Sequence, residues 1–209
     1  MIEAVARITR AVKVPVTADI EHAYAATPGA VADVVLRVIA AGAVGINLED
    51  CMPGAETLEP IALQADKITT IIKAVSKAGV RIVVNARTDV FLRALGAPET
   101  RLGVAVERGN AFLAAGADCV FVPGVNDRET ISALVNGIRG PVNVLAVQGT
   151  PAIADLEALG VARVSVGSGP MRASLALVRD VARELRDRGT YTAFTDRALP
   201  FNDVEELMR

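Results

Sequence analysis

One turn pattern recurs along this chain of 209 residues and constrains its fold more than any other feature. In the segments AAGAVGI, AAGADCVFV and ALGVARVSV, a helical pattern ends in glycine and a short apolar run follows at once. Glycine is the usual residue just after a helix, where the backbone becomes left-handed. Gly42, Gly79, Gly116 and Gly160 each lie between a predicted helix and the next strand. The sequence therefore predicts repeated helix–turn–strand units.

Short apolar runs alternate with helical patterns along nearly the whole chain. The runs are rich in β-branched residues and too brief for helices, which is typical of buried strands. They lie near residues 14 to 18, 44 to 48, 81 to 86, 119 to 122, 142 to 146 and 163 to 166. The helical patterns lie near residues 28 to 41, 61 to 78, 99 to 115, 127 to 138, 151 to 159 and 170 to 188. Thr27 and Pro28 are suited to cap and start the first of these helices. Such strict alternation predicts parallel strands joined by right-handed crossovers.

Two α/β architectures fit this alternation. An open doubly wound sheet often carries a glycine-rich first turn beside its ligand, whereas the first turn here carries carboxylates and no glycine. A (β/α)8 barrel gathers polar residues from the ends of many strands. The polar residues at predicted strand ends are Asp19, Glu21, Glu49, Asp50, Arg87, Asp89, Asn126, Gln148 and Ser168. We therefore predict an α/β fold of TIM-barrel type that is incomplete, with about six of the eight strand–helix units that a closed barrel requires. Either the barrel is modified or its first two strands are missing.

Composition favours a single α/β-barrel domain over residues 1–209. Hydrophobic residues make up 52% of the chain and aromatic residues only 3%, so Val, Ala, Leu and Ile must form the core, as in parallel sheets covered by helices. With a net charge of −2 and basic residues scattered along the helical segments, nothing attracts nucleic acid or an anionic membrane. Because no signal peptide or membrane-length apolar run is evident, we expect a cytoplasmic protein.

Carboxylates cluster at the ends of the first two predicted strands. Asp19 and Glu21 are spaced so that they share one face of an extended chain. Glu49 and Asp50 end the next apolar run. If these strands are parallel neighbours, up to four carboxylates meet. Their mutual repulsion would force some to take up protons, whereas a divalent cation would keep them ionised. The sequence therefore predicts a metal site.

Six segments occur in an order and spacing that resemble one family. They are DIEHAYA (19 to 25), GINLED (45 to 50), NARTD (85 to 89), GADCVFVPG (116 to 124), PVNVLA (141 to 146) and GVARVSVGSG (160 to 169). With them the chain resembles the isocitrate lyase and phosphoenolpyruvate mutase superfamily, including carboxyphosphonoenolpyruvate phosphonomutase-like members, over nearly all its length. The resemblance implies a (β/α)8 barrel whose last helix is commonly exchanged between subunits, so we expect a homodimer or homotetramer.

The resemblance also implies a Mg2+ site. Family members bind Mg2+, partly through water, with the acidic pair of a D-x-D-x-G-x-G segment and the Glu of an E-D pair, matched here by Asp19, Glu21 and Glu49. Glu21 is one methylene longer than the usual Asp, which Mg2+ tolerates because it keeps several waters; Mn2+ is an alternative ion. Arg87 matches the residue that contacts the substrate carboxylate or the metal-bound oxygens, so we predict that it is catalytic and binds substrate. Asp89 is either a further substrate-binding residue or the structural ion-pair partner of Arg87.

The sequence departs from the family pattern in three places. Ala23 and Ala25 replace glycines in a loop where positive φ is expected, which affects the geometry around Asp19. The loop of residues 51 to 60 lacks the K-[KR]-C-G-H motif of the lyases, and Cys51, next to a carboxylate, is predicted to pack with a raised thiol pKa rather than to react. The family's first two strands have no counterpart, so we expect an N-terminally truncated chain, as a fragment or through a misplaced start, with two open sheet edges and poor stability.

Several other residues have ordinary structural interpretations. His22, the single histidine, is interpreted as a surface residue of an exposed loop rather than a base. Cys119 is interpreted as a core residue. Asp19 has an alternative role as a cap of the turn after its strand. The GSGP run at residues 167 to 170 is interpreted as a strand-to-helix turn in preference to a phosphate site.

These inferences combine into one hypothesis about function. The family chemistry stabilises an enolate or alkoxide beside a carboxyl group, chelated to Mg2+. We predict a Mg2+-dependent lyase that makes or breaks a C–C bond in a small 2-oxo or 2-hydroxy dicarboxylate. Because the cysteine loop is missing, isocitrate cleavage is not expected and no proton donor is evident. The enzymatic alternative is a phosphonomutase or an oxaloacetate-type hydrolase at the same metal site, and the alternative from another class is a catalytically inactive truncated barrel.

Overall fold

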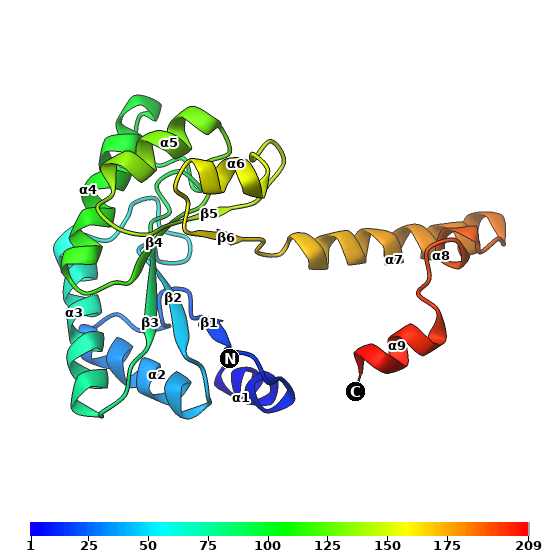
Figure 1. Cartoon of the computed structure of the whole chain (residues 1–209), viewed down its shortest axis with the longest axis horizontal. Helices are drawn as coiled ribbons and strands as arrows, with labels where there is room; N and C mark the ends of the chain where they lie inside the picture. Colours follow the sequence, from blue (N-terminus) through cyan, green and yellow to red (C-terminus); the bar gives the residue numbers. More distant parts are fainter. Residues whose placement is uncertain (209) are drawn as a thin grey trace. The chain divides into compact units, whose positions relative to one another are not determined.

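The architecture is a curled parallel sheet with helices around its outside. A computed structural model describes residues 1–208, and the chain groups into two compact units, Met1–Ser165 and Val166–Arg209. The first unit holds a six-stranded sheet of order β1-β2-β3-β4-β5-β6, in which every neighbouring pair is parallel. Helices follow the strands in turn and lie around the curled sheet (Figure 1). The predicted α/β fold, an incomplete barrel of TIM type, is confirmed.

The elements follow the predicted order, and their ends differ from the prediction by a few residues. The strands are β1 (Thr17–Asp19), β2 (Gly45–Glu49), β3 (Val83–Arg87), β4 (Cys119–Val122), β5 (Val142–Leu145) and β6 (Arg163–Ser165). The helices of this unit are α1 (Ile2–Ala11), α2 (Pro28–Ala40), α3 (Ile61–Lys77), α4 (Arg101–Ala114), α5 (Arg128–Gly137) and α6 (Ile153–Ala158), with the 3-10 helix η1 (Pro98–Thr100) before α4. Within the described residues β1 and β6 are the sheet edges, as predicted.

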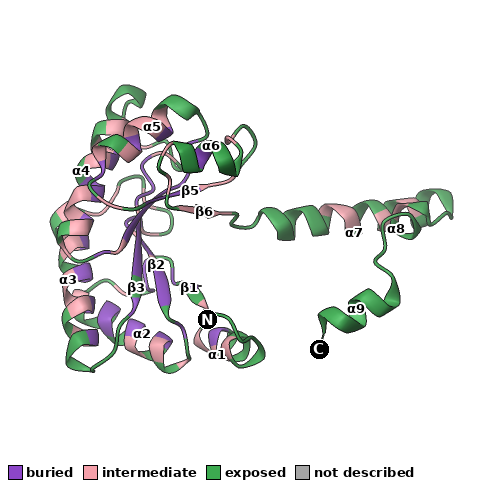
Figure 2. Cartoon of the chain, viewed as in Figure 1, coloured by how far each residue is buried: buried purple, intermediate pink, exposed green. Residues whose placement is uncertain are grey.

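The two faces of the sheet differ in side-chain chemistry. Ile46 and Leu48 of β2 and Val84 of β3 are buried in a hydrophobic cluster with residues of α2 and α3, and a second cluster joins β4 and β5 to α4, α5 and α6. Figure 2 shows this burial along the central strands and the adjoining sides of the helices. Alternate strand residues point to the opposite face, where Asn85 Nδ2 donates to Asn47 Oδ1 at 2.7 Å. The sheet therefore buries an apolar face under its helices and keeps polar groups on the other.

Cap and turn residues act at the helix ends as the sequence predicts. The Thr27 hydroxyl accepts a hydrogen bond from Ala30 N at 3.4 Å, and Pro28 begins α2. Gly42, just after α2, has a φ of +97°, and a Cβ there would lie 2.9 Å from the Thr9 hydroxyl oxygen. Both the backbone conformation and the space therefore require glycine at this turn.

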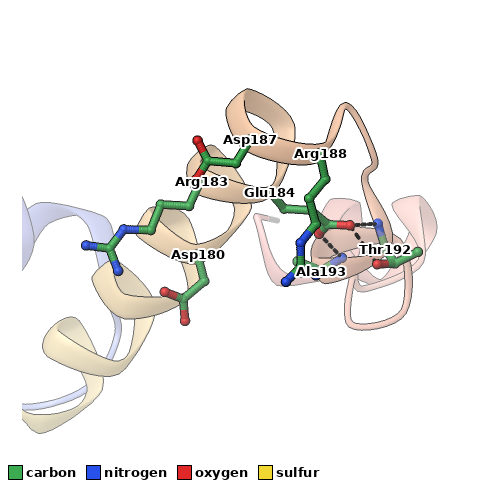
Figure 3. Close-up of a pocket in the computed structure, with 7 residues that line it drawn as sticks. All are labelled: Asp180, Arg183, Glu184, Asp187, Arg188, Thr192 and Ala193. Carbon is green, nitrogen blue, oxygen red and sulfur yellow. Dashed lines mark hydrogen bonds between the residues drawn. The ribbon is translucent and has the colours of Figure 1, made fainter.

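The second unit consists of helices that follow β6. They are α7 (Gly169–Arg188), α8 (Thr192–Thr195) and α9 (Phe201–Leu207), and the sequence did not predict the last two. The GSGP run forms a turn into α7, as predicted. The Glu184 carboxylate accepts hydrogen bonds from the backbone of Thr192 and Ala193, which holds α8 to α7 (Figure 3). It also accepts one from the Thr190 hydroxyl, and these hydrogen bonds keep the pKa of Glu184 at about 2. None of the helices in residues 1–208 combines the length and hydrophobicity that a membrane crossing needs.

Candidate metal centre

The carboxyl ends of β1, β2 and β3 bring the predicted site residues to one edge of the sheet. Asp19 ends β1, Glu49 ends β2 and Arg87 ends β3. Glu49 lies opposite Arg87 in the parallel register. Just past β1, the Glu21 carbonyl accepts a hydrogen bond from Glu49 N at 2.9 Å, so the chain continues beside β2. Because the strands are parallel neighbours, side chains far apart in sequence share one site.

Arg87 forms ion pairs with two carboxylates at this edge. Its Nη1 lies 2.9 Å from Glu49 Oε2. Its Nε and Nη2 donate to the two carboxylate oxygens of Asp89, at 2.6 and 3.2 Å. This two-pronged pairing fixes the plane of the guanidinium group. Of the two roles considered for Asp89, the structure shows the ion pair with Arg87, and a substrate contact stays a prediction.

Glu49 sits among charges that change its proton affinity. Burial, together with the charges of Asp89, Asp19 and Glu21, raises the pKa of Glu49 to about 7 against the opposing effect of Arg87. A divalent cation favours the ionised form of a carboxylate in such a cluster. The charges at this edge therefore suit a bound cation.

The loop after β1 is shaped by left-handed backbone conformations. Glu21, Ala23 and Tyr24 have φ angles of +51°, +63° and +53°. Ala23 stands where the family resemblance implies glycine, and it adopts the left-handed conformation, which costs roughly 1–2 kcal/mol for a residue with a Cβ. A hydrogen bond of 2.7 Å from Ala23 N to the Ile20 carbonyl and complete burial of the Ala23 methyl group hold it there. Ala25, the second replaced glycine, is not among the residues with positive φ.

His22 lies inside the site, and the prediction of an exposed surface residue is wrong. The residue is only 7% exposed. Its Nδ1 is buried and forms no hydrogen bond with any group in the described part of the chain. One ring nitrogen of His22 and one carboxylate oxygen from each of Glu21 and Glu49 lie within 4.8 Å of one another. Carboxylates together with an imidazole are donors that suit a divalent cation.

Asp19 is not a member of this three-residue group. Its Oδ1 accepts a hydrogen bond from Glu21 N at 3.1 Å, which is the turn-capping geometry considered as its alternative role. The structure therefore brings Glu21 and Glu49 together as predicted, adds His22, and leaves Asp19 as a predicted ligand.

Asp50 supports the site from within the core. Its carboxylate is fully buried; one oxygen accepts from Asp89 N at 3.0 Å and the other from Arg108 Nε at 2.6 Å. Arg108, on α4, also donates to the Glu59 carbonyl at 2.8 Å. Burial raises the pKa of Asp50, and Arg108 opposes that rise. Asp50 thus joins the ends of β2 and β3 to α4, and Arg108 is a supporting residue that the sequence analysis missed.

Comparison with known proteins decides the family. Residues 1–186 match the family described as Phosphoenolpyruvate phosphomutase. The chain belongs to this family. The superfamily that the six sequence segments resemble is therefore confirmed.

Two bacterial proteins and one solved structure show the similarity in detail. An uncharacterized protein of Mycobacterium tuberculosis is 41% identical over 172 residues, which cover 82% of this chain and 62% of that protein. An oxaloacetate decarboxylase of Rhodopseudomonas palustris is 30% identical over 207 residues, which cover 95% of this chain and 68% of the decarboxylase. A phosphonopyruvate hydrolase solved with oxalate and Mg2+ superposes with a TM-score of 0.79 at 28% identity, over 99% of this chain and 72% of the hydrolase. The chain thus spans less than two thirds of the length of the Mycobacterium protein.

The two cysteines of this phosphomutase family member are buried. Cys51 is 1% exposed, and Arg93 Nη1 donates to its Sγ at 3.2 Å. The thiol pKa of Cys51 is raised, as predicted, but burial is the largest cause and neighbouring carboxylates add less. Cys119 lies in β4 and is buried, which confirms its interpretation as a core residue. Both environments favour the unreactive thiol.

Proposed function

We propose that the chain binds Mg2+ or Mn2+ and cleaves a C–C bond in a small 2-oxo dicarboxylate, with oxaloacetate as the first substrate to test. The observation that carries this proposal is the meeting of Glu21, Glu49 and Arg87 at one sheet edge. The relatives named oxaloacetate decarboxylase support the substrate, and the related hydrolase solved with oxalate and Mg2+ supports the ion.

Each site residue has a distinct role in this proposal. Asp19, Glu21 and Glu49 would hold the cation, which when bound supplies a Lewis acid beside the 2-oxo carboxylate. Decarboxylation of oxaloacetate breaks the bond between C3 and C4; CO2 leaves, and the electron pair moves toward the 2-oxo oxygen as an enolate. A proton from water then adds to C3 and gives pyruvate. Arg87 would stabilise that charge, and its two hydrogen bonds to Asp89 fix the guanidinium in place beforehand. Asp89 is then a positioning residue.

A titration of the purified chain with Mg2+ and oxalate tests this proposal. Oxalate mimics the planar enolate, so its binding should require the cation, and oxaloacetate should be converted to pyruvate and CO2 in the same buffer. Glu49→Gln should weaken Mg2+ binding tenfold or more. Arg87→Met should keep Mg2+ binding and weaken oxalate binding.

The control for Arg87→Met is Arg128→Met, which removes an arginine from an exposed ion pair outside the site. It should leave Mg2+ and oxalate binding unchanged. If wild-type chain binds no oxalate with or without Mg2+, the enzymatic proposal fails and the inactive truncated barrel is the better account.

Hydrolysis of phosphonopyruvate is the second candidate, supported by the phosphonopyruvate hydrolase at 28% identity. In this reaction the C–P bond breaks, water supplies an oxygen to phosphorus, and the carbon receives a proton. Release of inorganic phosphate from phosphonopyruvate separates it from decarboxylation, which releases CO2. Rearrangement of phosphonopyruvate without phosphate release would indicate a phosphonomutase.

We also propose that the chain forms a homodimer or homotetramer. Two open sheet edges and a row of exposed apolar residues along α7, among them Met171, Leu175 and Val178, support self-association. Light scattering of the purified chain measures the mass, and a monomer at micromolar concentration would contradict the proposal.

A further inference from the structure

His22 is a buried histidine whose surroundings leave one ring nitrogen without a partner. The residue is 7% exposed, and Nδ1 makes no hydrogen bond to any of the described residues. A ring nitrogen of His22 lies within 4.8 Å of carboxylate oxygens of both Glu21 and Glu49. We propose that His22 is a nitrogen ligand of the metal site and gives it a preference for transition cations such as Mn2+ and Co2+ over Mg2+. This inference rests on the proposed function, because Glu21 and Glu49 are two of the three metal ligands named there.

The spacing of the three donors suits a single ion. In an octahedral site with metal–ligand distances of about 2.1 Å, ligands on opposite sides of the ion lie about 4.2 Å apart. Donor atoms that all lie within 4.8 Å of one another therefore need only small side-chain movements to contact one ion. Glu21 and Glu49 can make those movements because each carboxylate ends a chain of two methylene groups.

The surroundings of the imidazole favour a role of His22 as a metal ligand over a purely structural role in the core. A buried polar atom without a hydrogen bond costs roughly 1–3 kcal/mol, so core histidines normally have both ring nitrogens satisfied. A metal ion would use the lone pair that the protein leaves free at this ring. The Tyr24 ring lies 5.3 Å from the imidazole at an interplanar angle of 59°, which limits the orientations that His22 can adopt.

A nitrogen ligand changes which ion binds best. Mg2+ prefers oxygen ligands and keeps several waters. Imidazole binds first-row transition cations well, and affinities for mixed nitrogen and oxygen sites rise from Mn2+ to Co2+. A site that combines an imidazole with carboxylates should therefore bind Co2+ more tightly than Mg2+, and removal of the imidazole should reduce Co2+ binding far more than Mg2+ binding.

Pulsed electron paramagnetic resonance of the wild-type chain loaded with Mn2+ tests the ligand directly. A bound imidazole gives a 14N coupling that carboxylate and water ligands do not give. Because this measurement uses the unaltered protein, it does not depend on whether a variant folds. A spectrum of stoichiometrically bound Mn2+ without 14N coupling would overturn the inference.

Two substitutions test the preference between ions by equilibrium dialysis. His22→Leu introduces an apolar side chain of similar bulk and removes both nitrogens. His22→Asn offers an amide oxygen close to the position of Nδ1. We expect His22→Leu to lower Co2+ affinity about tenfold or more and to change Mg2+ affinity less than twofold. The Co2+ affinity of His22→Asn should lie between those of wild type and His22→Leu. Equal losses for both ions would indicate a purely structural role and overturn the inference.

The outcomes separate this inference from the proposed function. If Mn2+ binds with a 14N coupling but neither oxaloacetate nor phosphonopyruvate is converted, the proposed reaction fails and the inference on His22 holds. If Mg2+-dependent turnover occurs and the 14N coupling is absent, the reaction holds and the inference fails. If the chain binds none of Mg2+, Mn2+ and Co2+, both fail.

Discussion

The buried ion pair between Arg108 and Asp50 leads to a quantitative prediction about stability. Their side chains are 5% and 0% exposed. Arg108→Met removes the guanidinium group and keeps a long side chain to fill the space, so Asp50 stays buried without its charged partner while Asp89 N still donates to it. Leaving one partner of a buried pair uncompensated costs about 3–5 kcal/mol. We expect the free energy of unfolding to fall by about that amount at pH 8.

The loss should be smaller at low pH, because Asp50 can then take up a proton. Burial raises the pKa of Asp50 and Arg108 opposes the rise, so Arg108→Met raises it further. When the folded-state pKa lies above the ordinary value of 3.8, the folded state holds the proton more tightly. The stability that protonation of Asp50 contributes is fully present at pH values below 3.8, and it is lost as pH rises through the folded-state pKa. Arg108→Met should therefore differ less from wild type at pH 5 than at pH 8.

Urea unfolding followed by circular dichroism at the two pH values measures this effect. The matched control is Arg128→Met, which breaks the exposed ion pair of 3.0 Å with Asp155, whose two side chains are 58% and 51% exposed. It should cost no more than about 1 kcal/mol, with little difference between pH 5 and pH 8. Equal losses for the two variants, or a loss for Arg108→Met that does not depend on pH, would refute the reasoning.

Three further predictions concern a pair of glycines, a helix cap and the pH dependence of Mg2+ binding. Gly124→Ala should cost at least about 3 kcal/mol of unfolding free energy, because φ is +91° and the new Cβ would lie 2.6 Å from the Leu92 backbone. Gly79→Ala should cost only about 1–2 kcal/mol, because its φ is +69° but the space around it is open. Equal losses in urea unfolding would contradict this difference. Asp127→Ala removes the carboxylate that accepts a 2.8 Å bond from the first turn of α5, so thermal unfolding should show a loss of about 1 kcal/mol, and an unchanged melting temperature would disprove the cap. Burial raises the pKa of Glu49 to about 7, so protons should compete with Mg2+ and calorimetry should show weaker binding at pH 6 than at pH 8; an affinity that does not change with pH would rule out Glu49 as a ligand.

Most of the fold could be predicted from the sequence because local signals agree with the final packing. The helix starting at Thr27 and Pro28 and the turn at Gly42 depend on residues within a few positions of one another. The strands could be recognised because runs such as β4 are short, apolar and rich in valine, which fits burial on both faces. The meeting of Asp19 and Glu49 then follows from the parallel topology, because parallel strands bring successive strand ends to one edge of the sheet.

The parts that the sequence did not predict depend on contacts between distant segments. From the sequence, Arg108 has the features of a solvated helix residue. It gains Asp50 as its partner only because α4 packs against the sheet beside β4. His22 looks exposed because it lies in a polar loop, and its burial depends on how that loop folds against β2. The sequence contained one indication that His22 lies at the site, which is its position directly after Glu21. This indication was missed because, in an extended chain, neighbouring side chains point to opposite sides.

The left-handed backbone at Glu21 explains how neighbouring residues come to share one site. In an extended chain, Glu21 and His22 would point to opposite faces. The φ of +51° at Glu21 and of +63° at Ala23 interrupts that alternation on both sides of His22. The hydrogen bond from Glu49 N to the Glu21 carbonyl meanwhile keeps the loop beside β2. The strain of roughly 1–2 kcal/mol per left-handed residue is thus the cost of placing three donors together, and it is offset by the buried Ala23 methyl group and the backbone hydrogen bonds around it.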